Sequence, residues 1–155
     1  MPTTDWILQQ TRYQRLREII EEARKNGYDL RAMRYPRVPA VYHRMLGVNG
    51  GICLVRIAEK AYTRPSGLKY TQYSVKRADL STAIACIFYV AVPKYRQQFL
   101  IVPTRALRRM YFSSATRSAP NGARRVIIPL TGERSPLGHG EELLTYENAW
   151  RNLRS

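Results

Sequence analysis

Cysteine and histidine are scarce in this chain of 155 residues, which holds two of each. Cys53 and Cys86 lie inside apolar runs, and His43 and His139 stand alone in the sequence. A Cys/His zinc site needs several such ligands at short, regular spacing, so neither the number nor the spacing fits one. Two cysteines are also too few for a disulfide scaffold, and we expect buried thiols in a reducing, intracellular compartment.

Long hydrophobic runs are also missing. The longest apolar stretch, residues 83–93, is too short to cross a bilayer. Residues 1–5 lack the basic-then-apolar order of a secretory signal. We therefore expect no membrane partner, and a single domain over residues 1–155, because one core is usual at this length.

The motifs of many cofactor-dependent and nucleophilic enzymes are absent. The chain contains no Gly-rich phosphate loop, no G-x-G-x-x-G and no C-x-x-C. It also lacks the nucleophile elbow of a serine hydrolase. We therefore expect no bound organic cofactor.

Acidic residues are few, and this shortage is the strongest signal in the sequence. Twenty-six Lys and Arg stand against 11 Asp and Glu, which gives a net charge of +15. The imbalance is greatest in residues 51–112, where eleven basic residues accompany only Glu59 and Asp79. Nucleic acid is the first candidate partner, because Lys and Arg release counterions when they bind phosphates. A solubility or lineage bias in composition would produce the same surplus.

The order of apolar and turn residues predicts an α/β (α+β) fold with a small mixed sheet flanked by helices. A first helix should run from a cap at Asp5 to a stop at Asn26-Gly27, with a buried stripe over residues 16–23. Its glutamates, Glu18, Glu21 and Glu22, are then expected on a solvated face. Residues 28–50 should be irregular and end in a turn at residues 49–51. The other expected elements are strands over 52–61, 70–77, 84–92, 99–102 and 124–130, a turn over 64–67, a short helix over 104–110 and a last helix over 141–152.

The middle of the chain resembles a known superfamily in the order of its elements. The strand at 52–61 is followed by a Tyr-rich strand, an apolar strand and the run Phe99-Leu100-Ile101-Val102-Pro103-Thr104. This order, behind a helix with acidic residues, is similar to the core of the PD-(D/E)xK restriction-endonuclease-like superfamily over about residues 10–110, with a further strand and helix in 113–155. The resemblance implies a restriction-endonuclease-like core that grips duplex DNA. Active members hold Mg²⁺ between two carboxylates beside a lysine.

The carboxylates that this chemistry needs are missing from the signature strand. If residues 52–61 carry the signature, it falls at Arg56-Ile57-Ala58, with no carboxylate; if residues 70–77 carry it, Ser74-Val75-Lys76 keeps the lysine and has a serine for the acid. The resemblance therefore implies a degenerate active site without a metal. An active nuclease would have to gather other groups around Mg²⁺, and the candidates are Glu59, Asp79, Lys76, Gln72 and Glu22.

Basic residues of the predicted sheet, its turns, the short helix and the irregular segment are the expected nucleic-acid contacts. Arg outnumbers Lys 21 to 5, which favours fork-like contacts to phosphate. The candidates are Arg56, Arg64, Lys69, Lys76, Arg77, Lys94, Arg96, Arg105, Arg108, Arg109, Arg34, Arg37 and Arg44.

Three functions are compatible with these patterns. The first is a nucleic-acid-binding protein, with duplex DNA preferred over RNA, on a nuclease-like scaffold that no longer cuts. The second is an active Mg²⁺-dependent DNA endonuclease. The third is an RNA or ribonucleoprotein partner, since many of the eleven tyrosines lie near arginines and suit stacking on unpaired bases. A homodimer or a larger nucleoprotein complex fits each of them, and an acidic protein partner would also account for the charge.

Overall fold

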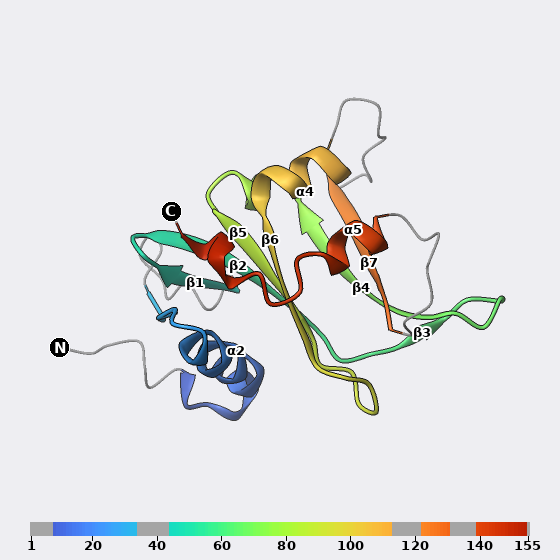
Figure 1. Cartoon of the computed structure of the whole chain (residues 1–155), viewed down its shortest axis with the longest axis horizontal. Helices are drawn as coiled ribbons and strands as arrows, with labels where there is room; N and C mark the ends of the chain where they lie inside the picture. Colours follow the sequence, from blue (N-terminus) through green and yellow to red (C-terminus); the bar gives the residue numbers. More distant parts are fainter. Residues whose placement is uncertain (1–7, 34–43, 113–121, 131–138, 155) are drawn as a thin grey trace.

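Figure 1 shows the computed structural model, which describes residues 8–33, 44–112, 122–130 and 139–154. The helical segments are η1 (Thr11–Tyr13), α2 (Gln14–Lys25), α3 (Arg77–Leu80), α4 (Thr104–Tyr111), α5 (Gly140–Leu144) and η3 (Trp150–Leu153). The strands are β1 (Met45–Val48), β2 (Gly51–Ala58), β3 (Tyr62–Thr63), β4 (Lys69–Lys76), β5 (Ala85–Val90), β6 (Gln98–Pro103) and β7 (Ala123–Pro129). The predicted mixed α+β class is confirmed.

Helix α2 covers one face of the first sheet with its apolar stripe. Leu16, Ile19 and Ala23 are buried among side chains of β2, β5 and β6, as the spacing predicts. The helix ends before Gly27, whose φ of +87° stops it where the sequence predicts. It begins at Gln14, after the turn η1 and later than predicted, and the expected cap at Asp5 lies outside the described residues.

The first sheet has four strands in the order β1-β2-β5-β6. β1 and β2 form an antiparallel hairpin at the predicted turn, where Asn49 and Gly50 have φ values of +46° and +81°; this left-handed pair suits a two-residue hairpin. β2 runs parallel to β5, and β5 runs antiparallel to β6, so the sheet is mixed. Every residue of β5 is buried, which confirms the predicted central strand. β1 lies inside the segment that was expected to be irregular, and that expectation is wrong for its four residues.

The expectation of one sheet is also wrong, because β4 belongs to a second sheet with the order β3-β4-β7. The turn that joins β3 to β4 lies at residues 64–67 as predicted, with Gly67 at a φ of +92°. β7 pairs antiparallel with β4 along its whole length, although β5, β6 and α4 lie between them in the sequence. Such long-range pairing leaves no local signal in the sequence. The inner face of β4 packs on the first sheet, where the rings of Tyr73 and Phe88 lie 4.9 Å apart.

The C-terminal segment does not form the single helix predicted over residues 141–152. α5 ends at Leu144, and the chain then pairs with the edge of β6 through Glu147, which bridges Leu100. Asn148 follows at a φ of +56° and donates its N–H to the carbonyl of Phe99. The unpaired edge of β6 offers these hydrogen bonds, so the chain bends away from the helical path. Beyond the bend, Trp150 packs against Phe99 in the core, with ring centroids 5.8 Å apart.

Cys53 and Cys86 are buried and not bonded to each other, as predicted. Burial raises the pKa of the Cys53 thiol to about 12 and raises the pKa of Cys86 as well. In the described part of the chain, the structure contains no helix with the length and apolar character that crossing a membrane requires.

Candidate nucleic-acid interface

Basic side chains gather at one end of the second sheet. β4 ends at Lys76, and α3 begins at Arg77. The antiparallel register places Ala123 opposite Lys76 and Arg125 opposite Ser74, so the start of β7 lies at the same end. Figure 1 shows this end, with the arrowhead of β4 beside α4. We call this surface the basic end; its members are Lys76, Arg77, Arg108, Arg124 and Arg125.

Three of the five are held by main-chain carbonyls at the C-terminal ends of α3 and α4. These carbonyls lack intrahelical partners and carry the negative end of the helix dipole, so they attract cations. The bonds run from Arg77 Nη2 to Phe112 O (3.2 Å), from Arg108 Nη2 to Leu80 O (2.6 Å) and from Arg124 Nε to Tyr111 O (2.9 Å). For Arg77 and Arg108, this is the one bond that the side chain makes within the described residues, so most of each guanidinium's N–H donors remain for another acceptor.

The carboxylates near the basic end already have arginine partners. Asp79 of α3 accepts a hydrogen bond from Arg56 Nη2 at 3.0 Å. Glu142 of α5 is paired with Arg109. The side chains of Lys76 and Arg125 are exposed and make no bond to a described residue. The positive charge of the basic end is therefore not neutralised by acids in the described part of the protein.

Arg56, a predicted nucleic-acid contact, has a structural position instead. Its side chain is 12% exposed and connects the two sheets. Nε donates to the Ser74 carbonyl at 3.1 Å, Nη1 to the Val55 carbonyl at 3.0 Å, and Nη2 to Asp79. Because these bonds use the guanidinium inside the protein, Arg56 does not belong to the basic end.

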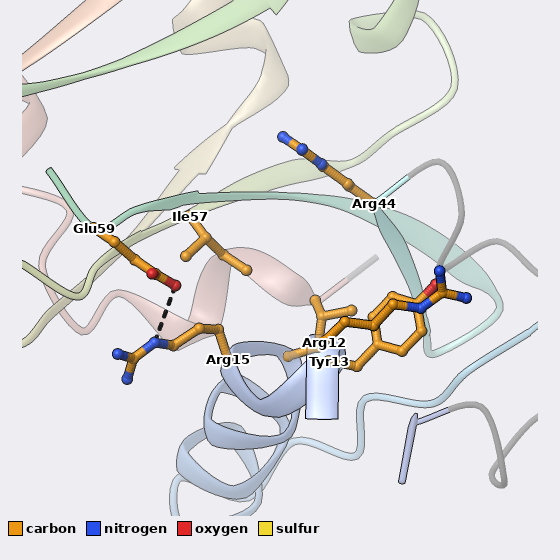
Figure 2. A pocket seen from close by; sticks show the side chains of 7 residues that line it. Arg12, Tyr13, Arg15, Arg44, Ile57 and Glu59 are labelled. Atoms are coloured by element: carbon orange, nitrogen blue, oxygen red, sulfur yellow. Dashed lines mark hydrogen bonds and ion pairs between the residues drawn. The ribbon is translucent and has the colours of Figure 1, made fainter. Parts of the chain in front are cut away.

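The other predicted basic contacts are spread over the molecule. Arg64 and Lys69 flank the β3–β4 turn, where Lys69 Nζ donates to Thr63 Oγ1 at 2.6 Å. Lys94 and Arg96 lie in the β5–β6 loop, and Arg96 is bonded to Glu147, which lowers the pKa of that carboxyl. On α4, Arg105 is exposed and Arg109 is paired with Glu142. Arg44 lines a pocket (Figure 2). Arg34 and Arg37 lie outside the described residues.

The residues proposed for an active metal site do not come together. Glu59 accepts from Arg15 Nε at 3.2 Å, Asp79 is paired with Arg56, and Glu22 lies 4.0 Å from Lys25. Within the described ranges, no three His, Cys, Asp or Glu side chains are grouped closely enough to hold a metal ion. Lys76 and Gln72 lie on β4, and Gln72 Oε1 is buried without a hydrogen-bond partner there. A lone amide oxygen is not the set of carboxylates that Mg²⁺ prefers, so these residues do not fit that ion.

Glu18 takes part in a network of hydrogen bonds. It was expected on a solvated face, yet its Oε2 accepts a hydrogen bond from the Tyr89 hydroxyl at 2.6 Å, and Tyr89 accepts one from Gln97 at 2.8 Å. Arg15 Nη1 donates to both of its carboxylate oxygens at 3.0 Å. Burial raises the pKa of Glu18, but the hydrogen bonds from Tyr89 and Arg15 outweigh it and leave that pKa below its ordinary value of 4.5.

The lowered pKa of Glu18 has a consequence for acid stability. A carboxyl whose pKa is lower in the folded state stabilises the fold above its unfolded pKa, and this contribution is lost as the pH falls through the folded pKa. We expect Glu18→Gln to lower the free energy of unfolding by about 1 kcal/mol at pH 7 and by much less near pH 3. Urea unfolding across this range measures it, with Glu21→Gln, an exposed residue of the same helix, as the control. If the free energy of unfolding changes with pH in the same way for the wild type and for Glu18→Gln, Glu18 does not have a lowered pKa in the folded protein.

Arg124 and Arg125 belong to the basic end but are not among the nucleic-acid contacts predicted from the sequence. A signal was present, because the two adjacent arginines open the strand predicted over residues 124–130. Their place beside Lys76 follows only from the pairing of β4 with β7, which the sequence does not reveal.

Comparisons with known proteins leave the family open. No family model and no curated protein matches the sequence. Among solved structures, the chain is similar to a bacterial homing endonuclease, I-Ssp6803I, at 15% identity and a TM-score of 0.47. The alignment covers 88% of this chain and 84% of that chain. The function of this chain therefore has to follow from its own side chains.

Proposed function

We propose that this chain binds nucleic acid through the basic end, that it prefers duplex DNA to RNA, and that it does not cut what it binds. One observation carries the proposal: β4, α3, α4 and β7 place five basic residues at one end of the second sheet, while the carboxylates near them are paired with other arginines. Such a surface attracts a dense row of phosphates and releases their counterions. Phosphate contacts position a protein on nucleic acid without reading its sequence.

The preference for a duplex is supported by the state of the tyrosines. Recognition of single strands depends on aromatic rings that are open to stacking. None of the tyrosines in the described residues is fully exposed. The half-buried rings of Tyr62 and Tyr70 stack on each other with centroids 5.6 Å apart. Lys60 lies over the Tyr62 ring at 5.2 Å from its centroid, and Arg64 lies over the Tyr70 ring at 5.9 Å. Unpaired bases would therefore find few open rings on this part of the protein.

The scaffold that we propose is a restriction-endonuclease-like one with a degenerate site. Its support is the order of elements in residues 10–110 together with the placement of Ser74 and Lys76, which are both exposed on the same face of β4. The lysine of the signature is thus accessible, while a serine stands where the carboxylate should be. Asp79, the first acidic residue after Lys76 in the sequence, is bonded to Arg56.

Competition for a fluorescently labelled DNA duplex tests this function. We expect unlabelled duplex DNA to displace the probe at about tenfold lower concentration than single-stranded RNA of the same length, because the duplex has the higher charge density. Probe recovered after incubation with Mg²⁺ should be intact on a gel. Equal or better displacement by the RNA would favour the RNA-binding function. Probe cut in Mg²⁺ but not in EDTA would favour the nuclease, and no binding at low salt would leave an acidic protein as the partner.

A further inference from the structure

The hairpin of β3 and β4 lies at the end of the second sheet that is opposite the basic end. β3 pairs with Lys69 and Tyr70, the first two residues of β4. β7 reaches the same point and ends there, because Pro129 lies opposite Tyr70. The turn of the hairpin extends further, and Figure 1 shows it projecting past the end of β7. Residues 63–67 are all exposed, so this hairpin arm, residues 62–70, is open to a partner.

The tip of the hairpin arm has a fixed backbone. Gly67 donates its N–H to the Arg64 carbonyl at 2.8 Å, and Arg64 donates its N–H to the Leu68 carbonyl at 2.9 Å. The ring of Pro65 fixes its own φ angle, and Gly67 adopts the φ of +92° that closes the turn. Pro65 and Ser66 therefore form a narrow, ordered tip without a large side chain.

The charge of the hairpin arm suits a polyanion. At the tip, the Arg64 guanidinium lies over the Tyr70 ring at 5.9 Å from the centroid. It makes no hydrogen bond or ion pair to a described residue, so its N–H donors remain for another acceptor. The strands β3, β4 and β7 contain no acidic residue. Phosphates that lie between the arm and the basic end would therefore meet no carboxylate on these strands.

The hairpin arm and the basic end are separated by the length of β4. This strand runs from Lys69 to Lys76, and at about 3.3 Å per residue it is about 25 Å long. The turn beyond Lys69 adds about 10 Å. The sum is close to one helical turn of B-DNA, which is about 34 Å. A straight duplex held at the basic end can therefore meet the arm about one turn away.

The shape of the tip suits the minor groove of a duplex. This groove is about 6 Å wide, and its base edges distinguish mainly A·T from G·C pairs. Arginine is attracted to the negative potential of narrow A·T-rich segments, and proline is among the residues that insert between base steps. Reading the major groove takes a set of polar side chains, whereas the tip offers Arg64 and the short Ser66.

We propose that the hairpin arm inserts Arg64 and Pro65 into the minor groove of the duplex that the basic end holds, about one helical turn from that contact, and that it favours A·T pairs there. This proposal rests on the proposed function, since it concerns a second contact with the same duplex. The arm adds a preference for base composition to phosphate contacts that carry none.

Fluorescence anisotropy with duplexes of two lengths tests the contact. A duplex of about 24 base pairs spans the arm and the basic end, and one of about 8 base pairs is too short to reach both. We expect Arg64→Gln to weaken binding of the long duplex by about tenfold and of the short one by less than about twofold. Arg24→Gln removes the same charge from an exposed position on α2 and should weaken both by less than about twofold. Equal losses in the two variants on the long duplex would overturn the proposal.

Base substitution in the long duplex tests the groove. Inosine lacks the 2-amino group of guanine, so an I·C pair resembles A·T in the minor groove and G·C in the major groove. We expect the wild type to bind A·T and I·C duplexes at least about threefold more tightly than a G·C duplex, and Arg64→Gln to bind all three alike. Binding of the I·C duplex as weak as that of the G·C duplex would contradict contact through the minor groove.

The proposed function and the role of the hairpin arm can fail separately in these measurements. If Lys76→Gln with Arg125→Gln loses affinity for the long duplex while Arg64→Gln does not, the basic end binds DNA and the arm does not. If the wild type binds neither duplex at low salt, the proposed function fails, and the role of the arm fails with it.

Discussion

Replacing Lys76 and Arg125 together with glutamine is expected to weaken duplex DNA binding by about a hundredfold at 0.1 M salt, because each lost phosphate contact costs about tenfold there. Both side chains are exposed and make no bond to a described residue, so the substitutions should leave the fold intact. Fluorescence anisotropy with a labelled duplex measures the change, and thermal unfolding checks the fold.

The matched control for this pair is the double variant Arg24→Gln with Arg151→Gln. It removes the same charge from exposed positions on α2 and η3, away from the basic end. We expect its affinity to fall by less than about threefold, since remote charges are screened at this salt concentration. Equal losses in the two double variants would mean that net charge, rather than this surface, determines binding.

Arg56→Met is expected to lower the free energy of unfolding by about 3 kcal/mol, because it removes three hydrogen bonds and leaves Asp79 without its partner. For a chain of this length, the loss corresponds to a fall in Tm of about 10 °C. Chemical and thermal unfolding measure the two quantities. Folded Arg56→Met should bind the duplex with nearly the affinity of the wild type, since the side chain is turned inward.

Arg105→Met is the control for Arg56→Met. Arg105 is exposed on α4 and makes no bond to a described residue, so its replacement should change stability by less than about 0.5 kcal/mol. If Arg56→Met unfolds like the wild type but loses duplex affinity, Arg56 is the nucleic-acid contact that the sequence predicts, and the structural assignment is wrong.

The features that the sequence predicts well depend on neighbouring residues. The buried stripe of α2, its stop at Gly27, the turn at residues 64–67 and the buried strand β5 are set by local periodicity and by backbone conformations that few residues adopt. These elements therefore lie where their sequence places them.

The errors concern partners that are distant in the sequence. The pairing of β4 with β7 divides the strands into two sheets. Glu147 pairs with the edge of β6 instead of continuing the last helix. Tertiary hydrogen bonds outweigh helix propensity at that point. The amino-acid composition of residues 141–152 does not indicate that Glu147 pairs with β6.

The candidate site shows the same limit at the level of side chains. The sequence identifies a basic segment, and Lys76, Arg77 and Arg108 do lie at one end of the second sheet. It does not reveal that Arg56 is hydrogen-bonded inside the protein or that Glu18 accepts a hydrogen bond from Tyr89. In a sequence, an exposed arginine or glutamate cannot be told from one that is hydrogen-bonded within the fold. Which charges are available is decided by the fold.

The salt dependence of duplex binding, measured for the wild type and for Lys76→Gln with Arg125→Gln, tests the role of the basic end most directly. If all five members contact phosphates, a plot of log K against log salt should have a slope of about −4 for the wild type, and the slope should be shallower by about 2 in the double variant. Parallel slopes, or no duplex binding by the wild type at low salt, would contradict the assignment of this surface.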